Sequence, residues 1–156
     1  MQEFEIEQIK EIIKQHGYEY KEILKNDSFS YIFLCQHRSN GQKFVIKMSI
    51  KQQIVEDESK NLMELCHPYI IKLYDIFEDD VNEYLVLEYC PNGTIEQKGK
   101  LPYKKFVRYS KQILEAIKFC HSKNIALRDI NPKNIYIDQY DQIKLTNFGM
   151  AKEFQN

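Results

Sequence analysis

The sequence predicts an α+β fold, and three observations support this prediction. Five β-prone stretches lie ahead of residue 91, one helical stretch is inserted among them, and beyond residue 100 the apolar residues recur at helical spacing before a short hairpin. Strands and helices that gather in different parts of a chain are typical of α+β proteins. The chain has 156 residues, the length of one ordinary domain or of a fragment of a larger one.

The chain opens with a predicted amphipathic helix over residues 3–15. Ile6, Ile9 and Ile13 share one face of this helix, and Gly17 ends the helical pattern. An Asn-Gly turn cluster further along joins two β-prone stretches, which with a third stretch predict an antiparallel meander. The three predicted strands cover residues 18–24, 31–37 and 44–48.

A second helix and two more strands complete the first part of the chain. The helix is predicted over residues 53–65, ahead of Pro68. The strands are predicted at residues 70–77 and 84–89, with an acidic turn between them. The run Pro91-Asn92-Gly93 then breaks the pattern and is the best candidate for a boundary between two lobes.

Beyond this boundary the apolar period becomes helical. Pro102 suits the first turn of a long helix. Two short strands at residues 134–138 and 142–145 follow the helix and form a predicted hairpin. The apolar stripe predicted for the long helix consists of Phe106, Tyr109 or Ser110, Ile113, Ile117 and Cys120.

The composition excludes several classes of protein. With 22 Lys and Arg against 23 Asp and Glu, the chain has no broad basic surface for non-specific nucleic-acid binding. No apolar run approaches the ~20 residues that cross a bilayer, and the acidic start does not resemble a secretion leader. We therefore expect no nucleic-acid or membrane partner and a cytoplasmic location. The four cysteines form no CxxC pair, which argues against the usual zinc and redox motifs.

Two polar motifs flank the predicted hairpin. Residues 127–134 spell Leu-Arg-Asp-Ile-Asn-Pro-Lys-Asn, and residues 146–149 spell Thr-Asn-Phe-Gly. These motifs resemble those of the protein kinase family, whose catalytic loop is H-R-D-L-K-P-x-N and whose metal-binding motif is D-F-G. Upstream, residues 44–47 resemble the V-A-I-K strand and residues 88–93 resemble the hinge. The resemblance extends over nearly the whole chain from Tyr18 onward.

The resemblance implies a kinase-like fold in two lobes. Residues 1–17 would form a helical extension. Residues 18–90 would form the small lobe, a five-stranded antiparallel sheet with one helix. Residues 91–156 would form part of a helical large lobe, comprising the hinge, the long helix, the catalytic loop and the D-F-G-like turn. The family continues beyond these elements, so the sequence is expected to be a truncated kinase domain.

The resemblance also implies phosphoryl transfer from Mg·ATP to a protein hydroxyl of the Ser/Thr type. Asp129 would accept the proton of the substrate hydroxyl, and Asn131 lies where the family has a lysine that faces the transferred phosphoryl group. Asn134 and Asn147 occupy the positions of the metal ligands. The residues implied to bind the nucleotide are Leu24, Ile32, Val45, Lys47, Glu58, Glu88, Cys90 and Tyr136. Among them, Glu58 would pair with Lys47, although the separation of eleven residues is short for the family and Glu56 is a poorer alternative.

Several departures from the family pattern affect the same function. Lys25, Asp27 and Ser30 stand at the three glycine positions of the phosphate-covering loop, where close backbone approach favours glycine. Asn147 replaces the D-F-G aspartate, and Mg²⁺ prefers carboxylates. Asn131 replaces a cation.

Two larger side chains are expected to narrow the adenine slot. Val45 stands where the family has alanine, and Tyr136 stands where it usually has leucine. In a close-packed site the added volume would partly fill the cavity.

We therefore expect a catalytically impaired kinase-like domain, a pseudokinase or a fragment, in which ATP and Mg²⁺ binding is weak or lost. An active Ser/Thr protein kinase and a nucleotide-independent scaffold remain alternatives. The partner would be a protein substrate or a binding protein. Self-association through the long helix is a further expectation, because its apolar stripe lacks the cover that the family supplies.

Overall fold

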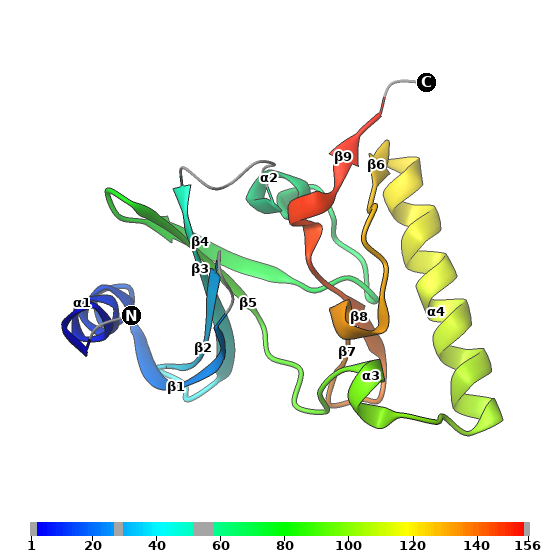
Figure 1. Cartoon of the computed structure of the whole chain (residues 1–156), viewed down its shortest axis with the longest axis horizontal. Coiled ribbons are helices and arrows are strands. Elements are labelled where there is room, and N and C mark those ends of the chain that lie inside the picture. The colour runs from blue at the N-terminus through cyan, green and yellow to red at the C-terminus, as the bar shows by residue number, and fades with distance from the viewer. Residues whose placement is uncertain (1–2, 27–29, 52–57, 155–156) are drawn as a thin grey trace. The chain divides into compact units, whose positions relative to one another are not determined.

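The computed structural model of the chain describes residues 3–26, 30–51 and 58–154. The chain divides into two compact units. The first unit comprises residues 1–53 and 74–89, and the second comprises residues 54–73 and 90–156. Figure 1 shows the elements in chain order.

The first unit contains one helix and a five-stranded sheet. The strands follow the order β1-β2-β3-β5-β4, and the β1–β2, β2–β3 and β3–β5 pairs are antiparallel. This arrangement confirms the predicted α+β order with a five-stranded sheet. The elements are α1 (Glu3–Gln15), β1 (Tyr18–Asn26), β2 (Ser30–His37), β3 (Lys43–Ile50), β4 (Leu73–Glu78) and β5 (Asn82–Glu88).

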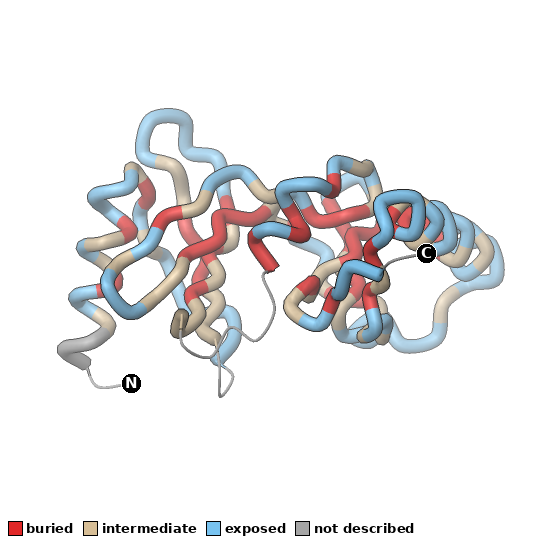
Figure 2. Tube along the Cα trace, turned by 90° about the horizontal axis from the view of Figure 1, so that it is seen from above, coloured by how far each residue is buried: buried red, intermediate tan, exposed pale blue. Residues whose placement is uncertain are grey.

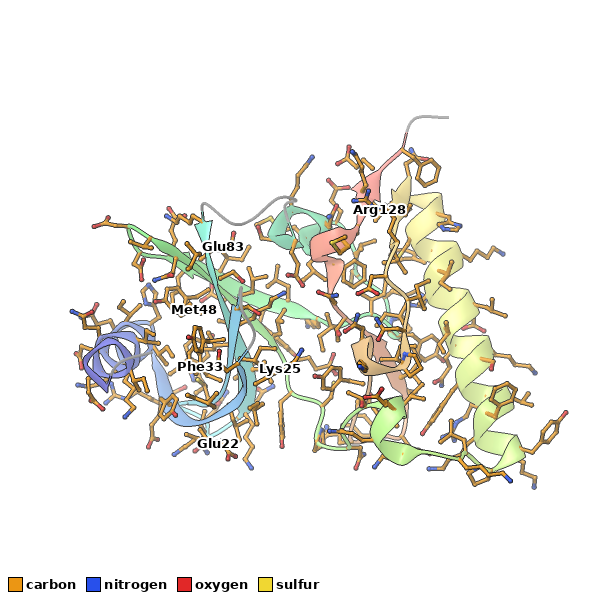
Figure 3. The ribbon with its side chains drawn as sticks, viewed as in Figure 1. Glu22, Lys25, Phe33, Met48, Glu83 and Arg128 are labelled. Atoms are coloured by element: carbon orange, nitrogen blue, oxygen red, sulfur yellow. The ribbon has the colours of Figure 1, made fainter. Side chains whose placement is uncertain are left out.

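The core of the first unit lies between α1 and one face of this sheet. Strand register places Phe33 opposite Ile46 and Ile46 opposite Val86, and none of the three side chains is exposed to solvent. Ile9 and Ile13 of α1 belong to the same buried cluster. Phe33 and Met48 point from the sheet toward α1 (Figure 3). The predicted isoleucine face of the first helix is therefore its buried face.

The second unit contains short elements around one long helix, α4. Figure 2 shows that α4 is exposed along most of its length. The elements are α2 (Glu58–Met63), α3 (Ile95–Lys98), α4 (Tyr103–Ser122), β6 (Ile125–Ala126), η2 (Pro132–Asn134), β7 (Ile135–Ile137), β8 (Ile143–Leu145), η3 (Phe148–Met150) and β9 (Lys152–Glu153). Strands β7 and β8 form the predicted hairpin, and β6 pairs with β9.

Several element boundaries differ from the sequence prediction, among them those of β1, α2 and β4. Strand β1 extends to Asn26, and α2 ends at Met63, while residues 53–57 of the predicted helix lie outside the described residues. Strand β4 begins at Leu73, not at residue 70. Ile70 instead forms a parallel bridge with Leu145, and the Ile71 amide donates to the Leu145 carbonyl at 2.9 Å. These residues are β-prone, but their hydrogen-bond partner belongs to β8.

The predicted stripe of α4 is right for Tyr109 and Cys120, which are buried, and wrong for Phe106. Phe106 is 58% exposed, whereas Gln112 is buried and accepts a hydrogen bond from the Ile143 amide at 3.1 Å. The apolar pattern did not predict the burial of Gln112, because its hydrogen-bond partner lies in the hairpin, 31 residues further along the chain. The buried residues of α4 are Tyr109, Gln112, Ala116 and Cys120.

Among the described residues, no helix is both long and apolar enough to cross a membrane.

Candidate functional site

The loop at residues 127–134 carries the Asp129 carboxylate, between the buried Leu127 and the exposed Ile130. Leu127 is buried, Arg128 has a positive φ of 59°, and the Asp129 amide donates to the Leu127 carbonyl at 2.8 Å. After Asp129, the Asn131 side chain accepts from the Lys133 amide at 3.0 Å and so caps η2. The loop is tightly wound, and its backbone fixes the direction of the Asp129 side chain.

Three asparagine amides donate hydrogen bonds to the Asp129 carboxylate. Asn131 Nδ2 lies 2.7 Å from Oδ1, Asn134 Nδ2 lies 2.7 Å from Oδ2, and Asn147 Nδ2 lies 2.9 Å from Oδ2. An ionised carboxylate only accepts hydrogen bonds, so each amide must turn its nitrogen toward Asp129. The structure thus gathers in one place the four residues predicted for the catalytic and metal positions.

The segment after β8 is tied to the same loop. The Thr146 amide and hydroxyl both donate to the Asn134 carbonyl, each at 3.0 Å. Asn147 then adopts a left-handed conformation with φ of 64°, which asparagine tolerates better than most residues. These bonds bring Asn147 to Asp129 although the two are separated in sequence by the whole hairpin.

A small cavity lies beside Asp129. Its polar lining comes from the carboxylate, the two asparagines that share Oδ2 and one threonine. The lining residues are Leu127, Asp129, Ile130, Asn134, Ile135, Leu145, Thr146 and Asn147.

Helix α2 supplies a second carboxylate to the turn. Glu58 is buried, and its Oε1 accepts a hydrogen bond from the Phe148 amide at 3.2 Å. Phe148 itself has no exposed surface. Leu62 and Leu127 are also buried.

Several residues predicted to bind nucleotide share one face of the first unit's sheet. Ile32 lies opposite Lys47, and Leu34 lies opposite Val45, so all four point away from the face that α1 covers. Leu24, near the end of β1, is 45% exposed. The binding of a nucleotide to this face stays a prediction.

The structure describes only the two ends of the predicted phosphate-covering loop, the loop in which Lys25, Asp27 and Ser30 replace glycines. Lys25 lies opposite Ile32 and Ser30 begins β2, while Asp27 lies outside the described residues. The consequence of the missing glycines for phosphate binding stays a prediction.

The predicted hinge spans the division between the two units. Glu88 ends β5 and lies opposite Phe44 in the first unit. Cys90 is buried in the second unit, where Tyr136 of β7 forms an antiparallel bridge with Thr94. The pairing of Lys47 with Glu58, and the narrowing of the adenine slot by Val45 and Tyr136, each join residues of different units and stay predictions.

The donor set at the loop does not fit a magnesium ion. Both predicted metal positions carry amides, and their nitrogens face Asp129. Within the part of the chain that the structure describes, no group of three or more His, Cys, Asp or Glu side chains is placed to hold a metal ion. Mg²⁺ binds oxygen ligands with near-octahedral geometry and favours carboxylates.

The sequence matches the family described as the protein kinase domain over residues 18–156. This chain belongs to the protein kinase family. The carbon catabolite-derepressing protein kinase of Candida albicans is 32% identical over 145 residues, which cover 86% of this chain and 23% of that protein. The CBL-interacting serine/threonine-protein kinase 18 of Arabidopsis thaliana is 29% identical over 145 residues, which cover 86% of this chain and 28% of that protein. The maternal embryonic leucine zipper kinase of Danio rerio is 30% identical over 156 residues, which cover 94% and 23% respectively.

Membership of the kinase family allows each position of the loop to be compared with its role in the family. Protein kinases generally use ATP and a metal ion, with the H-R-D aspartate as base and the D-F-G aspartate on the metal. In this kinase-family chain the first aspartate is present as Asp129 and the second is Asn147. The chain spans about a quarter of the length of the curated kinases it matches.

Proposed function

We propose that this kinase-family chain is a catalytically impaired domain, a pseudokinase that acts by binding a protein. One observation carries the proposal: Asn147, at the metal-binding position of the family, donates its amide to Asp129 at 2.9 Å. A carboxylate at position 147 would repel Asp129 unless a cation lay between them. The amide removes that repulsion and with it the charge that attracts the cation.

A second substitution supports the same conclusion. Asn131 stands where the family has a lysine, and its amide donates to the other oxygen of Asp129 at 2.7 Å. An amide carries no net charge to stabilise the transferred phosphoryl group. Two of the charged groups that the family uses in phosphoryl transfer are therefore replaced by neutral donors that bind Asp129.

An active Ser/Thr protein kinase is the second candidate. The assembled loop favours it, because Asp129 and Asn134 keep their family positions, and Asn134 Nδ2 lies 2.7 Å from Asp129 Oδ2. One of the kinases named above is called a serine/threonine-protein kinase, and that substrate class would then apply here. A scaffold that needs no nucleotide is the third candidate.

A phosphate-transfer assay on the full 156-residue chain tests these candidates. We would incubate the chain with γ-labelled ATP, Mg²⁺ or Mn²⁺, and casein as a general acceptor, and we would measure label on casein and on the chain itself. Asp129→Asn serves as the matched inactive control. The proposal expects no transfer above this control, whereas transfer that Asp129→Asn abolishes would establish the active kinase.

Nucleotide binding separates the remaining candidates. Thermal unfolding with and without Mg·ATP measures it directly, because a ligand that binds only the folded state raises the midpoint. A rise without transfer indicates a nucleotide-binding pseudokinase. An unchanged midpoint in the presence of millimolar Mg·ATP indicates the scaffold.

A further inference from the structure

A buried polar side chain on α2 belongs to none of the kinase motifs. Asn61 is 7% exposed, and its Nδ2 lies 3.4 Å from the Phe148 carbonyl oxygen and 3.3 Å from the Ala151 carbonyl oxygen. Both distances are at the long end of the range for a hydrogen bond. The single amide group nevertheless provides a donor to two carbonyls at the two ends of one turn.

Glu58 precedes Asn61 by one helical turn, on the same side of α2. Its carboxylate accepts from the Phe148 amide at 3.2 Å, so α2 binds both the N–H and the C=O of Phe148. The Phe148 carbonyl also accepts from the Ala151 amide at 3.0 Å within η3.

The loop at residues 127–134 also forms hydrogen bonds with this turn. Asn147 donates to Asp129, and Arg128 Nε donates to the Met150 carbonyl at 2.6 Å. Phe148 and Ala151 are 0% and 1% exposed. Backbone groups buried at this level need partners, and here the partners are the side chains of Glu58 and Asn61 and the one backbone bond between Phe148 and Ala151.

We propose that Asn61 is a positioning residue, which together with Glu58 keeps Phe148 buried and the turn formed without a bound metal or nucleotide. The inference deepens the proposed function, because it names what replaces the metal ion in organising this turn. Loss of the Asn61 amide would leave two buried carbonyls with fewer donors, which is costly where water cannot replace them. The turn would then open while the rest of the second unit stayed folded.

Amide hydrogen exchange of the full chain, followed by mass spectrometry, tests the inference. The reporters are peptides covering residues 146–154, since the Phe148 and Ala151 amides are both hydrogen-bonded in the closed turn. In Asn61→Asp, which keeps the shape but removes the donors at neutral pH, we expect about tenfold faster exchange in these peptides. Met63→Gln, at a 67% exposed position of α2, is the matched control and should leave exchange unchanged.

A pH series distinguishes a hydrogen-bonding role from simple packing. When protonated, the new carboxyl at position 61 has an O–H that can donate to one carbonyl, so protection should return as pH falls through its pKa. Each exchange rate of the variant is divided by that of the native chain at the same pH. The other charged groups around the turn are present in both proteins, so any effect of pH on them is removed by this comparison. These groups are Glu58, Arg128, Asp129 and the Lys60–Glu153 pair. A packing role alone would give no such recovery.

Asn61→Leu covers the case in which the aspartate variant does not fold. It restores apolar volume but supplies no donor, and it should speed exchange in the reporter peptides at every pH. Exchange that stays at the native rate in both variants would overturn the inference. An equal acceleration in α4 and in the β7–β8 hairpin would also overturn it, because the effect would then be global unfolding. None of these readouts depends on phosphate transfer, so failure of the inference and failure of the proposed function are distinguishable.

Discussion

At the scale of single residues, Asp129 and Asn147 define the chemistry of this kinase-family chain. Asn147 resembles the family's aspartate in shape, but it donates to Asp129 where a carboxylate would repel it. The same reasoning applies to Asn131, which binds the other oxygen at 2.7 Å. Three neutral amide donors thus surround the Asp129 carboxylate.

Restoring the family residue should therefore make stability depend on metal. In Asn147→Asp we expect the free energy of unfolding in EDTA to fall by about 1–2 kcal/mol, since one hydrogen bond becomes a repulsion. Added Mg²⁺ should recover part of this loss in the variant and change nothing in the native chain. Thermal unfolding with EDTA or 10 mM Mg²⁺ (about the usual assay level) measures both effects. An equal response of the native chain to Mg²⁺ would contradict the prediction.

The cysteines differ in burial, and we expect them to differ in reactivity for that reason. Burial raises the pKa of the Cys35 thiol to about 12 and that of the Cys120 thiol to about 11, whereas Cys66 is exposed. The thiolate is the reactive form, so iodoacetamide at pH 8 should label Cys66 first and reach Cys35 and Cys120 only on unfolding. Mass spectrometry of a labelling time course measures the order. Early labelling of Cys35 would show that its strand opens in the native state.

At the scale of elements, one aspartate joins the hairpin turn to α4. Asp141 accepts hydrogen bonds from Tyr109 at 2.6 Å and from Lys105 at 2.9 Å, and Arg108 donates to both its side chain and its carbonyl. The hydrogen bond from Tyr109, followed by that from Lys105, holds the pKa of Asp141 well below its usual range. Because the folded-state pKa is lower than the unfolded one, this contribution to stability is complete above about pH 4 and is lost as the pH falls further.

Asp141→Asn should flatten this acid dependence. Asparagine tolerates the positive φ of 61° at this position, so the backbone of the turn should be kept while the charge is lost. We expect a lower unfolding midpoint than that of the native chain at pH 6 and a smaller difference at pH 3. Asp80→Asn, at an exposed position in the β4–β5 turn, is the matched control. A constant difference between pH 6 and pH 3 would argue against the ionised carboxylate.

Helix α1 lies outside the residues that match the family but inside the core of the first unit. Ile13 has no exposed surface and belongs to the cluster with Phe33 and Ile46. Ile13→Ala should lower the free energy of unfolding by about 2–5 kcal/mol through lost burial and a new cavity. Gln8→Ala, at an exposed position of the same helix, should change stability little. Chemical denaturation of both variants measures the difference, and equal effects would show that α1 is not part of the core.

At the scale of the whole molecule, the surface combines a net charge of −1 with exposed apolar residues. Tyr103, Phe106 and Leu114 of α4 are 80%, 58% and 64% exposed. A low net charge gives little repulsion between copies, and exposed apolar patches favour association. The expectation of self-association through α4 thus stays a prediction, and of these three residues only Phe106 belongs to the predicted stripe.

Sedimentation velocity over a range of concentrations tests this expectation. The native chain should show a concentration-dependent rise in mean sedimentation coefficient, and Leu114→Lys should reduce it. Met63→Lys adds the same charge at an exposed position of α2 and should have no such effect. A native chain that stays monomeric at the highest concentration would end the proposal of self-association.

Local patterns in the sequence were sufficient to predict several elements of the fold and the position of two motifs. The isoleucine face of α1, the hairpin and the motifs at residues 127–134 and 146–149 all depend on residues within one or two turns of each other. Such spacing, together with the ordered motifs, identified the fold and the family and located Asp129.

Tertiary structure decided what those local patterns could not contain. Residues 70–71 bind β8 rather than continuing β4, and Gln112 is buried because it accepts from Ile143. Asn61 escaped prediction because its partners lie 87 and 90 residues further along the chain, and no periodicity records a hydrogen bond over that distance. Sequence spacing reports which side chains share a face, whereas the partner that satisfies a buried polar group is known only once distant segments meet.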